Sequence, residues 1–217
     1  MSGLTARLGG DSVVTVKRPY TSYESGPAAL DRYTDAGVLA SVALVNALAL
    51  GHAGGKPMAT SGARPALARV LAVDPPSVAL LTDDHGPGFV ALARRLHDVF
   101  SDLHIGDVDR AATRLNDLLA EHPANPHLAK EDGRWRLHHH PVDVDLVGMW
   151  TSICAEGMAR MIGSGWADRL GTCAGNDCDR VFVDLSKNAS RRFCSTTCQN
   201  RVKAAAFRLR RVAALRR

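Results

Sequence analysis

The sequence predicts a mainly α-helical protein that ends in a small cysteine-rich module of the treble-clef kind, made of a knuckle, a β-hairpin and a helix. Several stretches ahead of this module have apolar residues that recur at helical spacing. Four of the five cysteines then fall close together near the C-terminal end. These observations divide the 217 residues into an N-terminal tail (1–25), a helical body (26–165) and the cysteine-rich module (166–217).

Charge is distributed unevenly over these parts. The whole chain carries a formal net charge of +5, but residues 173–217 hold 11 Lys and Arg against 3 Asp and Glu. Residues 1–172 hold 16 basic against 19 acidic side chains. A mildly acidic body therefore precedes a strongly basic end. Such asymmetry favours an anionic partner for the basic end, most often nucleic acid.

The tail and the first helix come before a glycine-rich break. Residues 1–25 show little hydrophobic pattern and are expected to be a partly disordered tail. Residues 30–50 are rich in Ala, Leu and Val, and Asp31 or Thr34–Asp35 can cap a helix near their start. Residues 51–57, with the sequence GHAGGKP, are expected to end this helix.

Further helices are expected in the rest of the body, where apolar residues again recur at intervals of three and four. They are predicted over residues 64–71, 76–81, 88–103, 108–121 and 145–162. The last of them is apolar nearly all round, which indicates a buried helix. Its Cys154 is therefore expected to be a core thiol and not a metal ligand.

A turn and a strand are expected between the last two of these helices. Residues 122–126 are a cluster of turn-forming residues, and residues 135–138 have the composition of a hairpin strand. The run His138, His139 and His140 resembles a metal-binding tract. Successive residues on a strand point to opposite faces, so three adjacent histidines seldom bind one ion. We expect these histidines in a loop near the surface.

The four clustered cysteines have the spacing C-x4-C-x15-C-x3-C. Two closely spaced pairs separated by a longer loop are typical of a tetrahedral zinc site, because each pair can reach the metal from one tight turn. Two disulfides are the alternative, but the chain shows no export signal, and cytoplasmic thiols stay reduced. The sequence therefore predicts one structural Zn²⁺ ion held by Cys173, Cys178, Cys194 and Cys198. Four thiolates leave no open position on zinc, which argues against a catalytic metal.

The residues around these cysteines predict the rest of the module. Residues 173–178 are expected to form a tight knuckle, residues 180–184 a strand, and residues 191–194 a second strand that returns beside it. Ser195 is a good helix N-cap, and strong helix formers dominate from there to about residue 215. A segment this small rarely buries enough apolar surface to fold alone, so the metal is expected to contribute to folding.

Particular residues of this module carry a family resemblance. They are Ser190-Arg191-Arg192, Cys194-Ser195 and Cys198-Gln199-Asn200-Arg201. In this pattern the chain resembles the CGNR zinc-finger family, which is named for a Cys-Gly-Asn-Arg motif at its last zinc-ligand pair. Gln199 stands where the family has Gly, and Gln is the better helix former.

A weaker resemblance extends into the body. Ala43-Leu44-Val45-Asn46 resembles the Leu-Val-Asn element of the helical domain, called ABATE, that is paired with these zinc fingers. The two resemblances together imply a stress-responsive transcription regulator.

The C-terminal helix carries an apolar stripe as well as many basic residues. At about 100° per residue, one face holds Val202, Ala205, Ala206, Leu209, Val212 and Ala213. This stripe is expected to pack on the hairpin or on the body. Phe207 lies roughly opposite the stripe, where it can stack on a base or meet a partner. Packing of Phe207 against the body is the alternative, and we favour it.

Phosphate contact is the function expected of the basic side chains in the module. The candidates are Arg191, Arg192, Arg201, Lys203, Arg208, Arg210 and Arg211. The alternative is a solvated surface that binds nothing. DNA is favoured over RNA only by the family resemblance, and no base-specific contact follows from the sequence.

Two function hypotheses follow. The first is a DNA-binding regulator whose helical body senses a small-molecule effector or forms a homodimer. The second is a zinc-stabilised protein-interaction module that binds no nucleic acid. An enzyme is not expected, because no convincing set of catalytic side chains is found in the body. The longest apolar stretch, residues 38–50, is too short to span a membrane, so we expect a cytoplasmic protein without membrane contact.

Overall fold

The structure is a computed structural model, and it describes residues 4–8, 12–16, 36–49, 51–58, 62–131 and 133–215. Strands β1 (Leu4–Leu8) and β2 (Ser12–Val16) pair antiparallel, from Leu4 opposite Val16 to Leu8 opposite Ser12. Both strands fall within the predicted tail, and the other residues of the range 1–25 lie outside the described ones.

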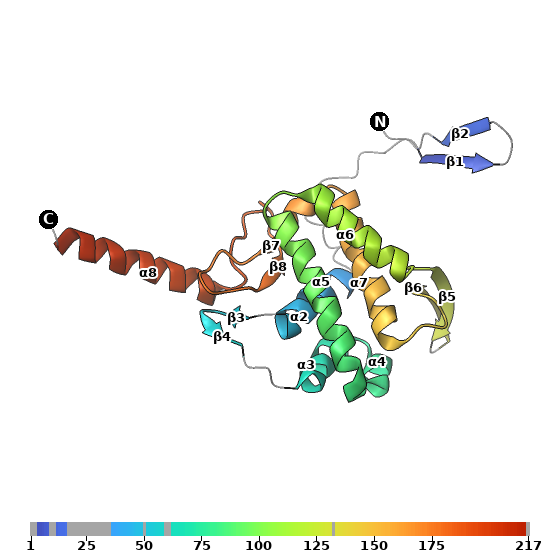
Figure 1. Cartoon of the computed structure of the whole chain (residues 1–217), viewed down its shortest axis with the longest axis horizontal. Coiled ribbons are helices and arrows are strands. Elements are labelled where there is room, and N and C mark those ends of the chain that lie inside the picture. The colour runs from blue at the N-terminus through green and yellow to red at the C-terminus, as the bar shows by residue number, and fades with distance from the viewer. Residues whose placement is uncertain are drawn as a thin grey trace.

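The body is built around a group of longer helices that pack on one another (Figure 1). They are α2 (Ala36–Leu48), α5 (Gly86–His104), α6 (Val108–Glu121) and α7 (Leu146–Gly163). Between α2 and α5 lie shorter elements: α3 (Ala63–Val70), η1 (Leu71–Val73), α4 (Pro75–Leu80) and η2 (Asp83–His85). The body thus has the predicted helices, with ends that differ by a few residues. Residues 30–35, where the first helix is expected to begin, lie outside the described residues.

Side-chain caps fix where α6 and α7 begin. The Asp107 carboxylate accepts a hydrogen bond from the Arg110 amide (3.1 Å). The Asp145 carboxylate accepts hydrogen bonds from the amides of Val147 (2.8 Å) and Gly148 (2.9 Å). Each bond satisfies an amide that finds no partner inside the first helical turn, so these caps stabilise the helix starts.

One hydrophobic core joins the body helices to the beginning of the cysteine-rich module. Leu44 of α2 and Phe100 of α5 are fully buried in it. Cys154 of α7 is fully buried there too, which confirms the prediction of a core thiol. Val181 and Val183, which lie between the two cysteine pairs, belong to the same core. The module is therefore packed against the body over its apolar residues.

A hairpin connects α6 to α7. Its strands are β5 (Pro126–Glu131) and β6 (Arg134–His139), paired from Pro126 opposite His139 to Glu131 opposite Arg134. The predicted strand at residues 135–138 is confirmed. The loop predicted for His138 and His139 is wrong, because the strand continues through both of them.

The histidines of this hairpin separate onto two faces, as alternation along a strand requires. The rings of His127, His138 and His140 lie together, with centroids 5.3–5.4 Å apart. The ring of His139 instead meets α7, where its Nδ1 lies 2.8 Å from Oε2 of Glu156. The hairpin is therefore tied to the body through His139.

A second, very small hairpin lies where the sequence predicts a break after α2. Strands β3 (His52–Ala53) and β4 (Lys56–Pro57) pair across a turn formed by Gly54 and Gly55. The φ angles of these glycines are +60° and +84°, a backbone conformation that favours glycine. We call residues 51–57 the glycine hairpin.

The β-hairpin of the cysteine-rich module differs from the predicted one. Strand β8 (Val181–Val183) lies where a strand is expected, but its partner is β7 (Leu170–Thr172), which precedes the knuckle. The second strand predicted at residues 191–194 is wrong. The Arg191 amide donates instead to the Asp184 carboxylate, and the Cys194 amide donates to Sγ of Cys173, so neither amide is available for a ladder.

Helix α8 (Thr196–Leu215) begins at the cysteines and projects away from the body (Figure 1). Among the described residues of α8, Cys198 is buried, whereas Leu209 is 71% exposed and Phe207 is 55% exposed. The expected packing of the outer apolar stripe on the hairpin or body is therefore wrong, and so is the packing of Phe207 on the body. The reason is the direction of the helix axis, which carries the outer turns beyond the reach of the body.

Of the helices in the described part of the chain, none combines the length and the apolar content that crossing a membrane requires.

Candidate metal centre

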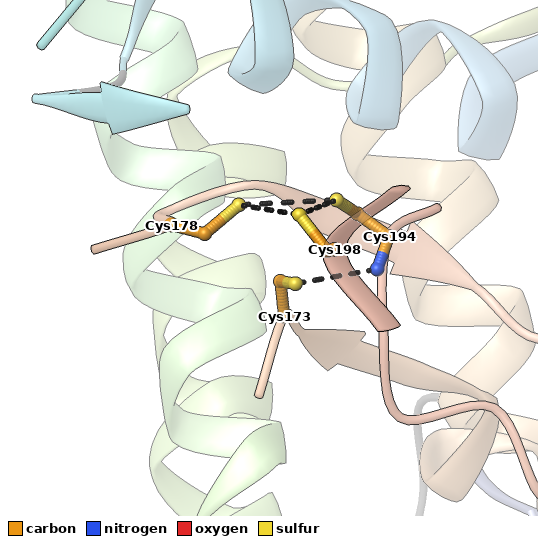
Figure 2. Close-up of side chains that lie close together, drawn as sticks. All are labelled: Cys173, Cys178, Cys194 and Cys198. Atoms are coloured by element: carbon orange, nitrogen blue, oxygen red, sulfur yellow. Dashed lines mark hydrogen bonds between the residues drawn. The ribbon is translucent and has the colours of Figure 1, made fainter. Parts of the chain in front are cut away.

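The four clustered cysteines place their sulfur atoms within 4.8 Å of one another (Figure 2). Sγ of Cys178 lies 3.8 Å from Sγ of Cys194 and 3.7 Å from Sγ of Cys198, and the last two atoms are 3.6 Å apart. A tetrahedral zinc ion with Zn–S bonds of about 2.3 Å would separate its sulfur ligands by about 3.8 Å. The observed separations fit this geometry and are far longer than a disulfide bond of about 2 Å.

Two short turns bring the cysteines to this cluster. Cys173 and Cys178 flank the knuckle, in which Asp177 adopts a φ of +52°. Cys198 lies in the first turn of α8, where its amide donates a hydrogen bond to Oγ of Ser195 (3.3 Å). This bond confirms Ser195 as the helix N-cap. The start of α8 is thereby fixed beside the sulfur atoms.

Burial and neighbouring sulfur atoms oppose the ionisation of two of these thiols. Burial raises the pKa of Cys173, and burial together with the adjacent Cys198 thiol raises the pKa of Cys194 to about 12. Burial acts in the same direction on Cys178, but the amides of Gly54 and Arg180 outweigh it and lower its pKa to about 7. A cation is the partner that stabilises all four thiolates at once.

Four cysteine sulfur donors favour zinc over other cations at this site. Three of the sulfur atoms lie at tetrahedral separation and that of Cys173 lies within 4.8 Å of them, and four thiolates suit zinc and leave no position open for water or a substrate. The cluster of Cys173, Cys178 and Cys198 is also the small core of this end of the module, with Phe193 and Cys194 packed against it. A metal bound here would hold the knuckle and α8 together where few apolar side chains do so.

The glycine hairpin of the body forms part of the wall of this site, which the sequence analysis does not anticipate. The amide of Gly54 donates a hydrogen bond to Sγ of Cys178 (3.4 Å), and the amide of Gly55 donates to the carbonyl oxygen of Asp177 (2.9 Å). A Gly-Gly pair between short extended segments is typical of a two-residue hairpin turn. That signal could have identified the hairpin, although not its position against the cysteines.

Two further polar residues join the body to the module. The side-chain amide of Asn46 on α2 donates to the Val181 carbonyl (3.0 Å) and accepts from the Val181 amide (2.9 Å). The Asp179 carboxylate accepts hydrogen bonds from the amides of Gly51 (3.0 Å) and His52 (2.7 Å). The Leu-Val-Asn resemblance singles out Asn46, but no sequence pattern pairs it with β8.

Arg201, a predicted phosphate contact, lies between the knuckle and the glycine hairpin. Its guanidinium donates a hydrogen bond to the carbonyl oxygen of Asn176. A Cβ added at Gly175 would lie 3.2 Å from Nη2 of Arg201, and a Cβ added at Gly55 would collide with the same guanidinium. The two glycines therefore make room for Arg201, which is half-buried and connects α8 to both segments.

A buried carboxylate organises the loop between β8 and Cys194. Asp184 is 2% exposed and accepts hydrogen bonds from the amides of Ser186 (2.8 Å) and Arg191 (2.7 Å). Burial raises the pKa of Asp184, but these hydrogen bonds and the charge of Arg169 outweigh it and hold the pKa below its usual range. Asp184 therefore stays ionised and anchors the loop that leads to the second cysteine pair.

Arg191, another predicted phosphate contact, is directed at its own loop. Its guanidinium donates hydrogen bonds to the carbonyl oxygens of Phe193 (3.0 Å), Val183 (3.1 Å) and Cys194 (2.5 Å). The same group lies 5.0 Å from the ring centre of Phe182, a cation–π distance. These contacts explain the position of Arg191, and phosphate contact by this residue stays a prediction.

All the predicted phosphate contacts except the half-buried Arg201 are exposed, Arg191 included. Arg192 lies in the loop before Cys194, and four residues lie along α8: Lys203, Arg208, Arg210 and Arg211. At about 100° per residue, the four on α8 fall within an arc of about 160°, on the side of the helix opposite the apolar stripe. An open cavity of about 440 Å³ adjoins the start of α8, and Arg191 and Arg192 line it together with Ser190, Ser195, Thr196 and Gln199.

Comparison with known protein families gives a match over this part of the chain. Residues 169–211 match the family model described as CGNR zinc finger. The match includes the four cysteines and most of α8, and it agrees with the resemblance drawn from the sequence motifs. Together with the cysteine cluster, it supports zinc binding by the module. A search of curated proteins finds no match to the chain.

Proposed function

We propose that this protein is a transcription regulator that binds DNA through its zinc-bound cysteine-rich module. The observation that carries the proposal is helix α8, which projects from the metal centre with five basic residues and no acidic one over Thr196–Leu215. The residues of α8 from 207 to 215 are exposed on all sides, and such a helical segment can enter a groove of duplex DNA and contact the phosphates on either side. One structural Zn²⁺ ion on the four cysteines would fix the direction in which this helix leaves the body.

In this proposal the exposed basic side chains contact the DNA phosphates. They are Arg192 in the loop and Lys203, Arg208, Arg210 and Arg211 on α8. The cavity beside Arg192 offers a place for one phosphate group, because Ser195, Thr196 and the N-terminal end of α8 supply donors and positive potential next to the arginine. The guanidinium groups of Arg191 and Arg201 donate to backbone carbonyls of the module, and in this proposal they hold in place the segments that carry the phosphate-contacting residues.

The body has the sensing or pairing role in this proposal. A cavity of about 610 Å³ lies against α2 and α3, and its lining is mostly alanine, with Leu39, Val70 and Val73 and one charged residue, Arg69. Such an apolar lining suits a small apolar effector. A homodimer formed through the body is the other arrangement. The proposal gives the chain no catalytic activity and no membrane partner, and it places the protein in the cytoplasm, where thiols stay reduced. The stress-related role rests on the family resemblance.

Salt-dependent DNA binding tests the proposal. Fluorescence anisotropy of a short labelled duplex is titrated with the zinc-loaded protein at salt concentrations between about 50 and 200 mM. Five phosphate contacts predict a slope of about −4.5 for the logarithm of the binding constant against that of the salt concentration. Arg192→Gln should reduce the magnitude of that slope by about 1, and removal of zinc with a chelator should abolish binding because α8 loses its fixed position.

Arg95→Gln is the matched control for this titration. Arg95 is an exposed arginine of the body that pairs with Glu121, so its loss changes the net charge equally without touching the module. This control should bind DNA with the salt slope of the wild type. The proposal fails if the wild type binds no duplex at the lowest salt, or if chelated and zinc-loaded proteins bind equally well.

The interaction-module hypothesis is supported by a different observation on the same helix. Phe207, Leu209 and Leu215 are 55%, 71% and 84% exposed, and apolar side chains of this kind are typical of protein-binding surfaces. Under this hypothesis the zinc-loaded protein binds no DNA, and Leu209→Lys abolishes capture of a protein partner. The anisotropy titration therefore separates the two functions.

A further inference from the structure

We infer that the glycine hairpin and Asn46 belong to the metal site, as positioning residues that link zinc binding in the module to the folded state of the body. The two regions are far apart in the sequence: Asn46 bonds to a residue 135 positions away, and Gly54 to one 124 positions away. The hydrogen bonds between them surround one cysteine, Cys178. The inference concerns zinc and the body alone, so it does not depend on DNA binding.

The glycine hairpin contacts a cysteine sulfur atom directly. The Gly54 amide points at Sγ of Cys178 from the body, at 3.4 Å. Hydrogen bonds to a metal-bound thiolate orient the ligand and spread its charge, and losing such outer contacts typically weakens metal binding by about 10–100-fold. A body residue is therefore in direct contact with a ligand atom of the module.

A set of hydrogen bonds to Asp177 and Asp179 holds the glycine hairpin beside Cys178. The Asp179 carboxylate accepts from the amides of Gly51 and His52, while the Asp179 amide donates to the carbonyl oxygen of His52 (3.0 Å). The Gly55 amide donates to Asp177 on the other side of Cys178. Residues on both sides of the cysteine are thus tied to one short hairpin, so movement of the hairpin would displace Cys178.

Asn46 connects the module to the core of the body. Asn46 lies on α2, immediately before the glycine hairpin, and makes two hydrogen bonds to Val181 of β8. Val181 is 1% exposed within the core that also contains Leu44 of α2. Helix α2 is therefore bonded to β8 through Asn46, and the chain leads from α2 into the glycine hairpin. Loss of zinc should destabilise the packing of α2, and a substitution in α2 should lower the affinity for zinc. The two effects have the same coupling free energy, because such coupling is reciprocal.

Zinc affinity of the full-length protein tests the first direction of this linkage. Zinc-loaded protein is equilibrated with a chromophoric zinc chelator, and the transferred metal is read from the dye. Asn46→Ala should weaken zinc binding by about 10-fold, the lower end for the loss of an outer contact, because Asn46 bonds to Val181 and not to a cysteine. Ser152→Ala is the matched control: it removes buried hydrogen bonds of α7 to the carbonyls of His122 and Gly148, away from the module. Its zinc affinity should equal that of the wild type.

A pair of glycine substitutions keeps the test decisive if Asn46→Ala fails to fold. Gly54 and Gly55 both have positive φ, so alanine strains the backbone at either position. A Cβ at Gly54 meets nothing within 4 Å, whereas a Cβ at Gly55 meets the Arg201 guanidinium. Gly55→Ala should therefore weaken zinc binding more than Gly54→Ala does. Zinc affinities equal to that of the wild type in both variants would count against the inference.

Hydrogen exchange of the wild type tests the reverse direction. The amides of Gly51, His52, Gly54 and Gly55 should be protected in the zinc-loaded protein and should exchange rapidly after chelation. Amides of the fully buried Leu96 and Leu115, far along α5 and α6, should stay protected in both states. The inference is wrong if residues 51–55 exchange at the same rate with and without zinc, or if Asn46→Ala folds and binds zinc as tightly as the wild type.

Discussion

Asp184 and Asp102 are buried carboxylates with different kinds of partner. Asp184 accepts hydrogen bonds from loop amides, whereas Asp102 on α5 accepts them from the Nε atoms of Arg110 and Arg114 on α6, each at 2.7 Å. Burial raises the pKa of Asp102, but the two arginines outweigh it and hold the pKa below its usual range. The ionised Asp102 therefore ties α5 to α6.

We expect Asp102→Asn to lower the free energy of unfolding by about 2 kcal/mol at pH 7, because hydrogen bonds to charged groups contribute about 1.5–3 kcal/mol. The folded-state pKa of Asp102 lies below the unfolded value of about 3.9, so its contribution is fully present above that value. The contribution is lost as the pH falls through the folded-state pKa. Urea unfolding of wild type and variant should show a difference that shrinks below about pH 4.

The exposed Asp117 on the same pair of helices provides the control for this measurement. Asp117→Asn should change stability little at any pH, since exposed charges contribute little. A difference between wild type and Asp102→Asn that stays constant through the acid range would show that the charge of Asp102 is not what ties the helices.

The roles of single arginines are the part of the site that the sequence predicts least well. Charge alone makes seven basic residues equivalent candidates, yet in the structure the guanidinium groups of Arg191 and Arg201 donate hydrogen bonds to backbone carbonyls. The carbonyl oxygens that Arg191 reaches come from both β8 and the irregular loop before α8. No periodic pattern in the sequence encodes the direction of these carbonyl oxygens. Only the folded backbone therefore distinguishes an arginine that bonds to them from one that does not.

At the scale of elements, the outer half of α8 is free of the rest of the fold. Every described residue from Phe207 onward is exposed. We expect removal of residues 208–217 to leave zinc content unchanged and to change stability by less than about 0.5 kcal/mol, as is usual for exposed positions. The same removal deletes five arginines, of which Arg208, Arg210 and Arg211 are proposed phosphate contacts, so the salt slope of DNA binding should fall in magnitude by about 3.

A full-length variant separates charge from helix length in this experiment. Replacing Arg208, Arg210 and Arg211 with glutamine keeps the helix and should reproduce the reduced salt slope. If the shortened protein binds DNA with the wild-type slope, the outer turns of α8 make no phosphate contacts. If it loses zinc, the outer turns support the metal site in a way that the structure does not predict.

Helices are the elements that the sequence predicts best. Helix α6 matches its predicted range, because its apolar spacing is regular and Asp107 marks its start. The strand predicted at residues 191–194 fails for the opposite reason. Its composition is compatible with a strand, but the buried Asp184 and the cysteine sulfur take the amides that a ladder would need. Competition of this kind between distant groups is not visible in local propensity.

At the scale of the whole molecule, charge and packing divide the chain differently. The excess of basic over acidic residues begins with the cysteine-rich module, but the hydrophobic core continues into the module through Leu170, Val181 and Val183. The cysteine spacing predicts which four residues form the metal site. It gives no sign that Asn46 and the glycine hairpin complete it, since these residues come from positions more than 100 residues earlier.

The metal content of the full-length protein tests the central claim most directly. Native mass spectrometry of the wild type should detect about one zinc ion per chain. Cys178→Ser should lose the ion, whereas Cys154→Ser should retain it, because Cys154 is buried in α7 outside the cluster. A wild-type protein without zinc and with disulfides among Cys173, Cys178, Cys194 and Cys198 would contradict the account.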